Sequence, residues 1–255
     1  MASTETSGSG DLGRTLELLW ETGPRPSRGP KPGLTLDRIV EAAVQVADAE
    51  GLEAVTMRRV ATELGTGTMT LYRYLPGKSE LLDLMLDRVQ RPDPDLGAAE
   101  GGWRGALERV ARGTLALYRR HPWLLHVNQA RPILGPAAIE SMETVLSAIT
   151  PMGLSDVELI SVIVLVDNYV VGAARSEVFH QEALRTTGMT DADFWQAQIP
   201  TIERALATGR FPTMAELDEN AFDQEFDHFG FGLRRILDGL EGLVAERARG
   251  RPGAR

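Results

Sequence analysis

A short run of hydroxyl, thioether and basic side chains near residue 70 has the chemistry of a surface that reads DNA. Its members are Thr68, Met69, Thr70, Tyr72 and Arg73. Hydroxyls can bond to bases or phosphates, a methionine can meet a thymine methyl, and an arginine can donate two hydrogen bonds to guanine. The run therefore predicts contacts with base edges in the major groove.

Four further residues extend this predicted surface. Arg58 and Lys78 stand near the starts of neighbouring predicted helices, where positive charge and free backbone N–H groups suit phosphates. Thr56 and Tyr74 complete the predicted DNA-contacting set.

The elements that must position these side chains form a helix-turn-helix over residues 57–74. An apolar face comprises Val60, Leu64, Leu71 and Tyr74. Ala61 is small where two helices would cross, and Gly65 supplies a tight turn. The second helix of such a unit lies in the major groove. An ordinary αα-hairpin would show a similar pattern, and the basic residues around the segment favour the DNA-binding interpretation.

The rest of the chain shows helical periodicity and almost no strand pattern, which predicts an all-α protein. Helices are expected over residues 36–50, 56–64, 68–75, 79–89, 103–121, 123–130, 136–150, 155–179, 191–208 and 218–249. The Pro, Asp and Gly residues of 91–102 predict a linker. We expect a flexible polar arm over 1–33, a DNA-binding domain over 34–90, an effector-binding and dimerisation domain over 103–249 and a tail over 250–255.

Composition limits the classes of protein that fit. The 255 residues include 27 Lys and Arg, 36 Asp and Glu and no cysteine, for a net charge of −9. Disulfides, thiolate zinc sites and cysteine nucleophiles are excluded, and a cytoplasmic location is expected. The arm lacks the apolar core of a signal peptide, and no uninterrupted apolar stretch reaches the ~18 residues of a membrane span. An acidic chain argues against bulk coating of nucleic acid but leaves a local DNA-binding face open.

The polar arm carries three basic residues, Arg25, Arg28 and Lys31. Two interpretations stay open for them: contacts in the DNA minor groove, or a solvated tail.

Two predicted helices indicate how the C-terminal part packs. Residues 159–174 are apolar on nearly all sides, which predicts a helix surrounded by others. The last helix carries a seven-residue apolar repeat formed by Phe222, Phe226, Phe229, Leu233, Ile236, Leu240 and Leu243. This seam is our predicted dimer interface, although periodicity alone leaves open whether its partner is the same chain or a second copy. Gly232, Gly239 and Gly242 beside the seam predict close backbone approach.

A metal-dependent helical-bundle enzyme is the main alternative. Glu177 with His180, and Glu225 with His228, form two Glu-x-x-His pairs, which carboxylate-bridged metal sites use. No nucleophile elbow is present, and the residues around Lys78 lack the first glycine of a phosphate-binding loop. We therefore predict no catalytic residues, no bound metal and no cofactor.

Residues 34–89 resemble the DNA-binding domain of the tetracycline-repressor (TetR) family. The resemblance rests on Ile39-Val-x-Ala-Ala, Val55-Thr-Met-Arg-Arg-Val-Ala, Thr70-Leu-Tyr-Arg-Tyr and Gly77-Lys-Ser-Glu-Leu-Leu. The C-terminal part resembles the family's effector domain through Arg120-His-Pro-Trp-Leu, Leu134-Gly-Pro and Phe229-x-Phe-Gly-Leu. The resemblance implies an all-helical homodimer that represses transcription from a palindromic operator and is released by a small-molecule effector.

A mixture of aromatic and polar residues predicts where an effector would bind. A cavity between helices is usually apolar with a few polar groups. The candidate residues are Trp103, Tyr118, His121, Trp123, His126, Asp167 and Asn168. Because Asp167 and Asn168 interrupt the most apolar predicted helix, we expect a helix neighbour or a ligand to satisfy them.

Overall fold

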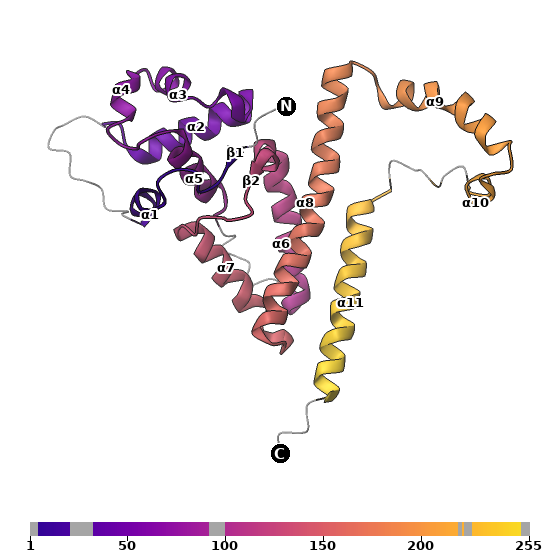
Figure 1. Ribbon diagram of the computed structural model, residues 1–255. Coiled ribbons are helices and arrows are strands. Elements are labelled where there is room, and N and C mark those ends of the chain that lie inside the picture. Colours follow the sequence, from indigo (N-terminus) through magenta and orange to yellow (C-terminus); the bar gives the residue numbers. More distant parts are fainter. Residues whose placement is uncertain (1–4, 21–32, 92–99, 219–220, 222–225, 251–255) are drawn as a thin grey trace.

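The computed structural model describes residues 5–20, 33–91, 100–218, 221 and 226–250, and these are almost entirely helical (Figure 1). The all-α prediction is confirmed. The helices form an N-terminal group, a central group and an extended arm. The predicted DNA-contacting residues lie in the N-terminal group, and most of the predicted effector-binding residues lie in the central group.

The N-terminal group contains α2 (Leu36–Glu50), a 3₁₀ turn η1 (Leu52–Ala54), α3 (Met57–Glu63), α4 (Thr68–Leu71) and α5 (Lys78–Val89). Thr35 caps α2 by accepting a hydrogen bond from the Arg38 backbone N–H at 3.2 Å. Gly51 ends the helix with a φ of +86°, a conformation that favours glycine. Helix α2 buries its apolar face against α3 and α5.

The central group contains α6 (Gly102–Arg120), η3 (Pro122–His126), α7 (Pro136–Ile149), η4 (Thr150–Met152) and α8 (Asp156–Thr187). Helix α6 packs against α7 and α8. A capping box begins α8, because the Ser155 and Glu158 side chains each bond to the other's backbone N–H. The helix continues past residue 179, where we predicted its end, and stops at Gly188 with a φ of +65°.

Within its own chain, helix α8 is covered on one face only, so helices of one chain do not surround it as the pattern of residues 159–174 predicts. One face is buried through residues such as Val162, Val166 and Val170. The opposite face is exposed, including Val157 at 77% and Val164 at 52%. By length and composition α8 could cross a membrane, and only 28% of its most apolar stretch is buried. Core helices of water-soluble proteins have the same length and composition, so these two properties do not show that α8 spans a membrane. What the structure does show is an apolar face of α8 that no other helix of the chain covers.

Helices α9 (Asp191–Leu206) and α10 (Pro212–Ala215) form an arm that projects away from the other helices (Figure 1). Neither helix has a buried residue. Several large apolar side chains on the arm are exposed: Phe194, Trp195, Ile199, Ile202, Phe211, Met214 and Leu217.

The last helix, α11 (His228–Gly250), begins later than predicted and lies beside α8 (Figure 1). Its start is set by Asp227, whose carboxylate accepts a hydrogen bond from the Gly230 backbone N–H at 2.7 Å. Residues 218, 221 and 226–227, which we placed in this helix, lie outside it.

The predicted dimer seam is in part a seam within one chain. Leu233 and Leu240 are buried in a core cluster with residues of α6 and α8, and Phe229, Ile236 and Leu243 are partly buried against it. Phe226 is exposed, and Phe222 lies outside the described residues. A side chain at Gly232 would overlap the Tyr169 ring, as close packing requires, whereas Gly239 and Gly242 face open space.

Two other predictions about local structure are wrong. Residues 123–130 do not form a helix: η3 ends at His126 and a short strand β2 (Val127–Asn128) follows. The N-terminal arm is not entirely a flexible tail, because β1 (Glu5–Thr6) pairs in parallel with β2 and α1 (Leu12–Trp20) packs against α5. The sequence signal was the amphipathic pattern of α1, which buries Leu19 and packs Leu18 against the same core. Arg25, Arg28 and Lys31 lie outside the described residues.

Candidate nucleic-acid interface and effector cavity

Helices α3 and α4 form the helix-turn-helix predicted from the sequence. Gly65 turns the chain between them with a φ of +63°. Val60 and Leu71 are fully buried and Ala61 is 2% exposed, so the two helices share one small core. Leu64 and Tyr74 pack against its edge. This core positions α4 at the outer surface of the N-terminal group (Figure 1).

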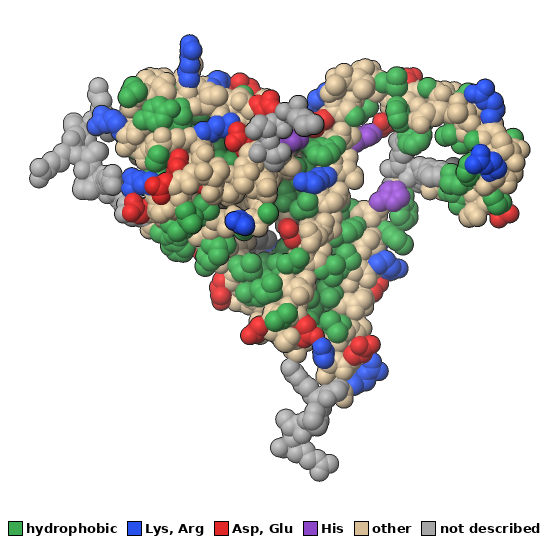
Figure 2. All heavy atoms as spheres, viewed as in Figure 1, with side chains coloured by type: hydrophobic (Ala, Val, Ile, Leu, Met, Phe, Trp, Pro, Cys, Tyr) green, Lys and Arg blue, Asp and Glu red, His purple; other side chains and the backbone are tan. Residues whose placement is uncertain are grey.

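The exposed side of α4 and of the turn after it carries the side chains predicted to contact bases. Helix α4 ends at Leu71, not at Leu75 as we predicted, so Tyr72 and Arg73 lie in that turn. Met69 is 77% exposed and Tyr72 is 47% exposed. Arg73 is exposed, while Thr68 and Thr70 are half-buried. These exposed side chains stand beside a basic residue on the same short segment, and this combination can contact both bases and phosphates. The space-filling view shows Lys and Arg side chains along the outer edge of this N-terminal group (Figure 2).

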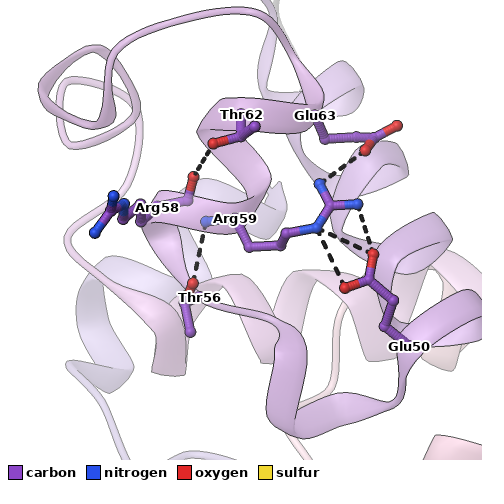
Figure 3. A network of polar contacts seen from close by, with 6 residues as sticks. All are labelled: Glu50, Thr56, Arg58, Arg59, Thr62 and Glu63. Carbon is purple, nitrogen blue, oxygen red and sulfur yellow. Dashed lines mark hydrogen bonds and ion pairs between the residues drawn. The ribbon is translucent and has the colours of Figure 1, made fainter.

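The two consecutive arginines of α3 have different surroundings (Figure 3). The Arg59 guanidinium donates to both carboxylate oxygens of Glu50 and to Glu63, with N–O distances from 2.6 to 3.3 Å. These bonds raise the pKa of Arg59 and lower the pKa of Glu50. The Arg58 side chain points away from this network (Figure 3). Arg59 therefore ties α3 to α2, while Arg58 is available to a ligand.

The remaining predicted contact residues have partners within the chain. Thr56 caps α3 by accepting a hydrogen bond from the Arg59 backbone N–H at 3.0 Å. The Tyr74 hydroxyl donates to the Leu34 carbonyl oxygen at 2.7 Å. The Lys78 ammonium lies 2.8 Å from a carboxylate oxygen of Glu5 in the N-terminal segment. Thr56 and Tyr74 thus have structural roles in addition to the predicted ones.

An open cavity of about 1590 Å³ lies where α6, α8 and the start of α11 meet. Its aromatic lining includes Tyr169, Phe226 and Phe229. Its charged lining is mixed, with the arginines Arg112, Arg119 and Arg185 and the acids Glu177, Glu182 and Asp227. Figure 2 shows an opening between the upper parts of α8, α11 and the arm, with histidine side chains at its edge. The cavity combines aromatic surface with charged groups, as small-molecule sites do.

Hydrogen bonds fix several groups of this cavity. The Tyr169 hydroxyl donates to the Phe229 carbonyl oxygen at 2.7 Å, and the two rings stack with centroids 5.6 Å apart. Arg119 donates two hydrogen bonds to Glu177, at 2.7 and 2.8 Å, which raise the pKa of Arg119. Burial raises the pKa of Tyr169. Tyr169 is therefore a neutral, oriented side chain at neutral pH.

The structure brings only part of the predicted effector set to this cavity. Asn168 lines it, and Asp167 beside it is exposed rather than buried. His126 lies 3.1 Å from Glu182, which lines the cavity. Trp103 and Tyr118 are partly buried in the central core, and burial with the Asp167 charge raises the pKa of Tyr118 to about 12.

His121 and Trp123 instead connect the two groups of helices. The Trp123 indole N–H donates to the Asp48 carboxylate of α2 at 2.8 Å, and His121 Nδ1 lies 2.7 Å from the same oxygen. Both side chains are buried. Their position links the end of α6 to the N-terminal group.

The sequence did not lead us to Tyr169, Arg112 or Arg119. The sequence did contain hints of their roles: Tyr169 directly follows the candidate Asn168, and the two arginines lie on one face of α6. What was missing was the packing of α11, which brings Phe229 over to Tyr169.

The metal-site alternative has no support. Glu177 is paired with Arg119, and His180 lies 2.8 Å from Asp191. Glu225 lies outside the described residues. In the part of the chain that the structure describes, no three His, Asp or Glu side chains are grouped to hold a metal ion.

Comparison with known proteins agrees with a helix-turn-helix regulator. Residues 39–85 match the model of the bacterial regulatory proteins of the tetR family, and residues 93–244 match that of the tetracyclin repressor-like C-terminal domain. The chain therefore belongs to the TetR family of transcriptional regulators.

Individual relatives agree with this assignment. The HTH-type transcriptional repressor DrrR1 of Streptomyces coeruleorubidus is 71% identical over 248 residues, covering 96% of this chain and 91% of its own. The class E tetracycline repressor protein of Escherichia coli is 26% identical, covering 84% and 94%. The structure of ActR from Streptomyces coelicolor in complex with actinorhodin has a TM-score of 0.67 and 29% identity, covering 83% and 97%.

Proposed function

We propose that this protein represses transcription by binding a two-fold operator through α3 and α4, and that a small molecule in the cavity releases it. The exposed face of α4 is the single observation that carries the DNA-binding part. Met69 and Tyr72 project outward from a helix whose other face is fully packed. The DrrR1 relative, described as a transcriptional repressor, supports repression as the outcome.

Within this proposal the predicted residues divide into two roles. Base edges are contacted by Thr68, Met69, Thr70, Tyr72 and Arg73, because α4 and the turn after it present them together. Arg58, Lys78, Thr56 and Tyr74 lie on neighbouring elements and contact or position phosphates. The Arg58 side chain points away from the ion pairs that hold Arg59, and this supports the division.

The effector is an aromatic molecule with polar groups. Stacking surface from Tyr169, Phe226 and Phe229 would bind its rings, and Arg185 and Arg112 would face its polar groups. The structure of ActR, a relative at 29% identity, in complex with actinorhodin supports a small-molecule effector for this chain. Asn168 is the one member of our predicted effector set that lines this cavity, and it would orient the ligand.

The functional unit is a homodimer. The exposed side of α8 presents Val157, Ile160, Val164 and Leu165 to solvent in a single chain. On α11, Phe231 is 46% exposed, and Gly239 and Gly242 face open space where another backbone can approach. A second copy that pairs α8 and α11 with their symmetry mates would cover both surfaces in an isologous contact. The apolar side chains of the α9–α10 arm are further surface for the same partner.

Domain boundaries follow from these assignments. We assign residues 34–90 to DNA binding and 103–249 to effector binding and dimerisation, joined by 91–102. The two family matches, over 39–85 and 93–244, are compatible with this division. A regulator that acts on bacterial DNA is expected in the cytoplasm.

The test combines selection and footprinting. Genomic fragments retained by the full-length protein would be sequenced, and the protected region mapped by nuclease footprinting. We expect a palindrome whose half-sites lie about 34–36 Å apart or slightly more. Failure to enrich any sequence, or retention of duplexes regardless of sequence, would overturn the proposal.

A further inference from the structure

The N-terminal segment 5–20, here called the strap, binds both groups of helices at once. Its β1 strand pairs with β2 of the central group, with Glu5 opposite Val127 and Thr6 opposite Asn128. The next residue, Ser7, donates its hydroxyl to an Asp83 carboxylate oxygen of α5 at 2.8 Å. The chain therefore passes from the effector-binding side to the DNA-binding side within three residues.

The strap satisfies two buried acids of α5. Glu80 and Asp83 are 5% and 3% exposed, and they lie one turn apart. Asp83 also accepts a hydrogen bond from the Gly8 backbone N–H at 3.0 Å, and Glu80 accepts one from the Asp11 backbone N–H at 2.9 Å. Buried carboxylates without donors are costly, so these bonds hold the strap in one register.

Close packing and a second anchor fix the strap further. A side chain at Gly10 would overlap the Glu80 carboxylate. Helix α1 buries Leu19 in the core of the N-terminal group, and the Trp20 indole N–H donates to the Leu134 carbonyl oxygen at 3.2 Å. The strap is thus a packed element of the fold.

The strap also reaches a residue of the proposed DNA interface. The Glu5 carboxylate lies 2.8 Å from the Lys78 ammonium, and both side chains are about one-third exposed. Lys78 is the first residue of α5, where a DNA phosphate would be bound. A single ammonium cannot be fully neutralised by the carboxylate and also attract a phosphate at full strength.

We propose that the strap is an autoinhibitory element: Glu5 competes with the operator backbone for Lys78. The inference rests on the proposed phosphate contact of Lys78. Because β1 is paired with β2, the position of Glu5 depends on the central group, and the competition is connected to the effector-binding side. An operator phosphate must displace Glu5 before Lys78 contributes fully to DNA binding.

The size of the effect follows from the exposure of the pair. Ion pairs at the protein surface contribute little, so their loss changes an equilibrium by about two- to fivefold. We therefore expect Glu5→Gln to raise affinity for duplex DNA by about this factor. The gain should be present on the selected operator and on a duplex of random sequence, because phosphate contacts do not read sequence.

Fluorescence anisotropy with these two labelled duplexes tests the proposal on the full-length protein. Glu17→Gln is the matched control, because it removes the same charge from the strap, and among the described residues the Glu17 carboxylate pairs with Arg14, at 2.8 Å, and not with Lys78. We expect it to leave affinity nearly unchanged. In a Lys78→Ala background, Glu5→Gln should have no effect. With Lys78 present, Glu5→Asp keeps the charge and should retain most of the inhibition that Glu5→Gln removes.

A steric pair of variants tests the strap without changing charge. Gly10→Ala would push against Glu80, whereas Gly13→Ala on the same segment meets only an Asp11 oxygen at 3.4 Å. We expect Gly10→Ala, and not Gly13→Ala, to raise DNA affinity as Glu5→Gln does.

Equal gains for Glu5→Gln and Glu17→Gln would overturn the proposal, since net charge alone would explain them. A gain that persists without Lys78, or a loss of affinity in Gly10→Ala, would overturn it as well. A wild-type protein that binds no selected duplex would instead refute the proposed function. The two failures are therefore distinguishable.

Discussion

The DNA-binding group and the C-terminal helices differ in how completely one chain buries them. Helix α2 buries seven of its fifteen residues, and Leu71, Leu75 and Leu81 are at most 1% exposed. In α9 and α10 no residue is buried, and α8 leaves an apolar face open. A single chain therefore completes the first region and leaves the second with surface for a partner. Substitutions in the first region should therefore affect folding or DNA contacts, whereas substitutions on the open surface of the second should affect dimerisation.

The largest effect is expected from a charge on the open face of α8. Val164→Glu would place a carboxylate in the proposed interface with no partner for its charge, which costs several kcal/mol. We expect monomers in sedimentation velocity and operator affinity lower by about 100-fold or more. Ser147→Glu, at an exposed position of α7, adds the same charge as a control. A Val164→Glu protein that remains dimeric would show that the open face of α8 is not the dimer interface.

The buried seam of α11 should respond differently. Leu233 is 1% exposed within its own chain, so Leu233→Ala should lower the free energy of unfolding by about 2–5 kcal/mol. Phe231→Ala, on the 46% exposed side, should chiefly weaken dimerisation. Urea unfolding at several protein concentrations separates the two effects. A Leu233→Ala protein as stable as wild type would contradict an intrachain seam.

Within the DNA-binding group, base contacts and phosphate contacts should be separable. Arg73→Ala should reduce discrimination at one base pair by about 1–3 kcal/mol if its guanidinium reads guanine. Lys78→Ala should weaken binding to all sequences and reduce its salt dependence. Anisotropy titrations over a salt series, with single-base operator variants, measure both. Loss of only sequence-independent affinity in Arg73→Ala would make Arg73 a phosphate contact.

The smallest effect concerns the start of α8 and depends on pH. Bonds from the Ser155 backbone and side chain, with Arg247, lower the pKa of Glu158 to about 2. Because the folded-state pKa lies below the ordinary value, Glu158 stabilises the fold above about pH 4.5, and this is lost as pH falls toward 2. Thermal unfolding should show Glu158→Gln less stable than wild type at pH 6, with the difference shrinking at low pH. A constant difference would mean that packing, not charge, is responsible.

The same contrast explains how much the sequence could predict. The helix-turn-helix is built from local signals: Thr35 and Thr56 as caps, Gly65 as the turn and apolar residues at helical spacing. The seam of α11 has an equally clear period, but periodicity does not say which surface covers it. Leu233 proved to face α6 and α8 of its own chain.

The effector region and the strap depend on contacts between distant residues. Tyr169 meets Phe229 sixty residues later, and Ser7 meets Asp83 seventy-six residues away. Neither pairing has a local sequence pattern. The polar composition of residues 1–33 predicted a flexible arm, and only the tertiary partners of Ser7, Gly8 and Asp11 make part of it a packed strap.

The stoichiometry of the operator complex tests the central claim most directly. Native mass spectrometry of the full-length protein with its footprinted operator would count the chains on one duplex. A dimer with one α4 in each half-site predicts two chains per duplex, or a multiple of two, and no species with a single chain at saturation. A saturated complex with one chain per duplex would contradict the account.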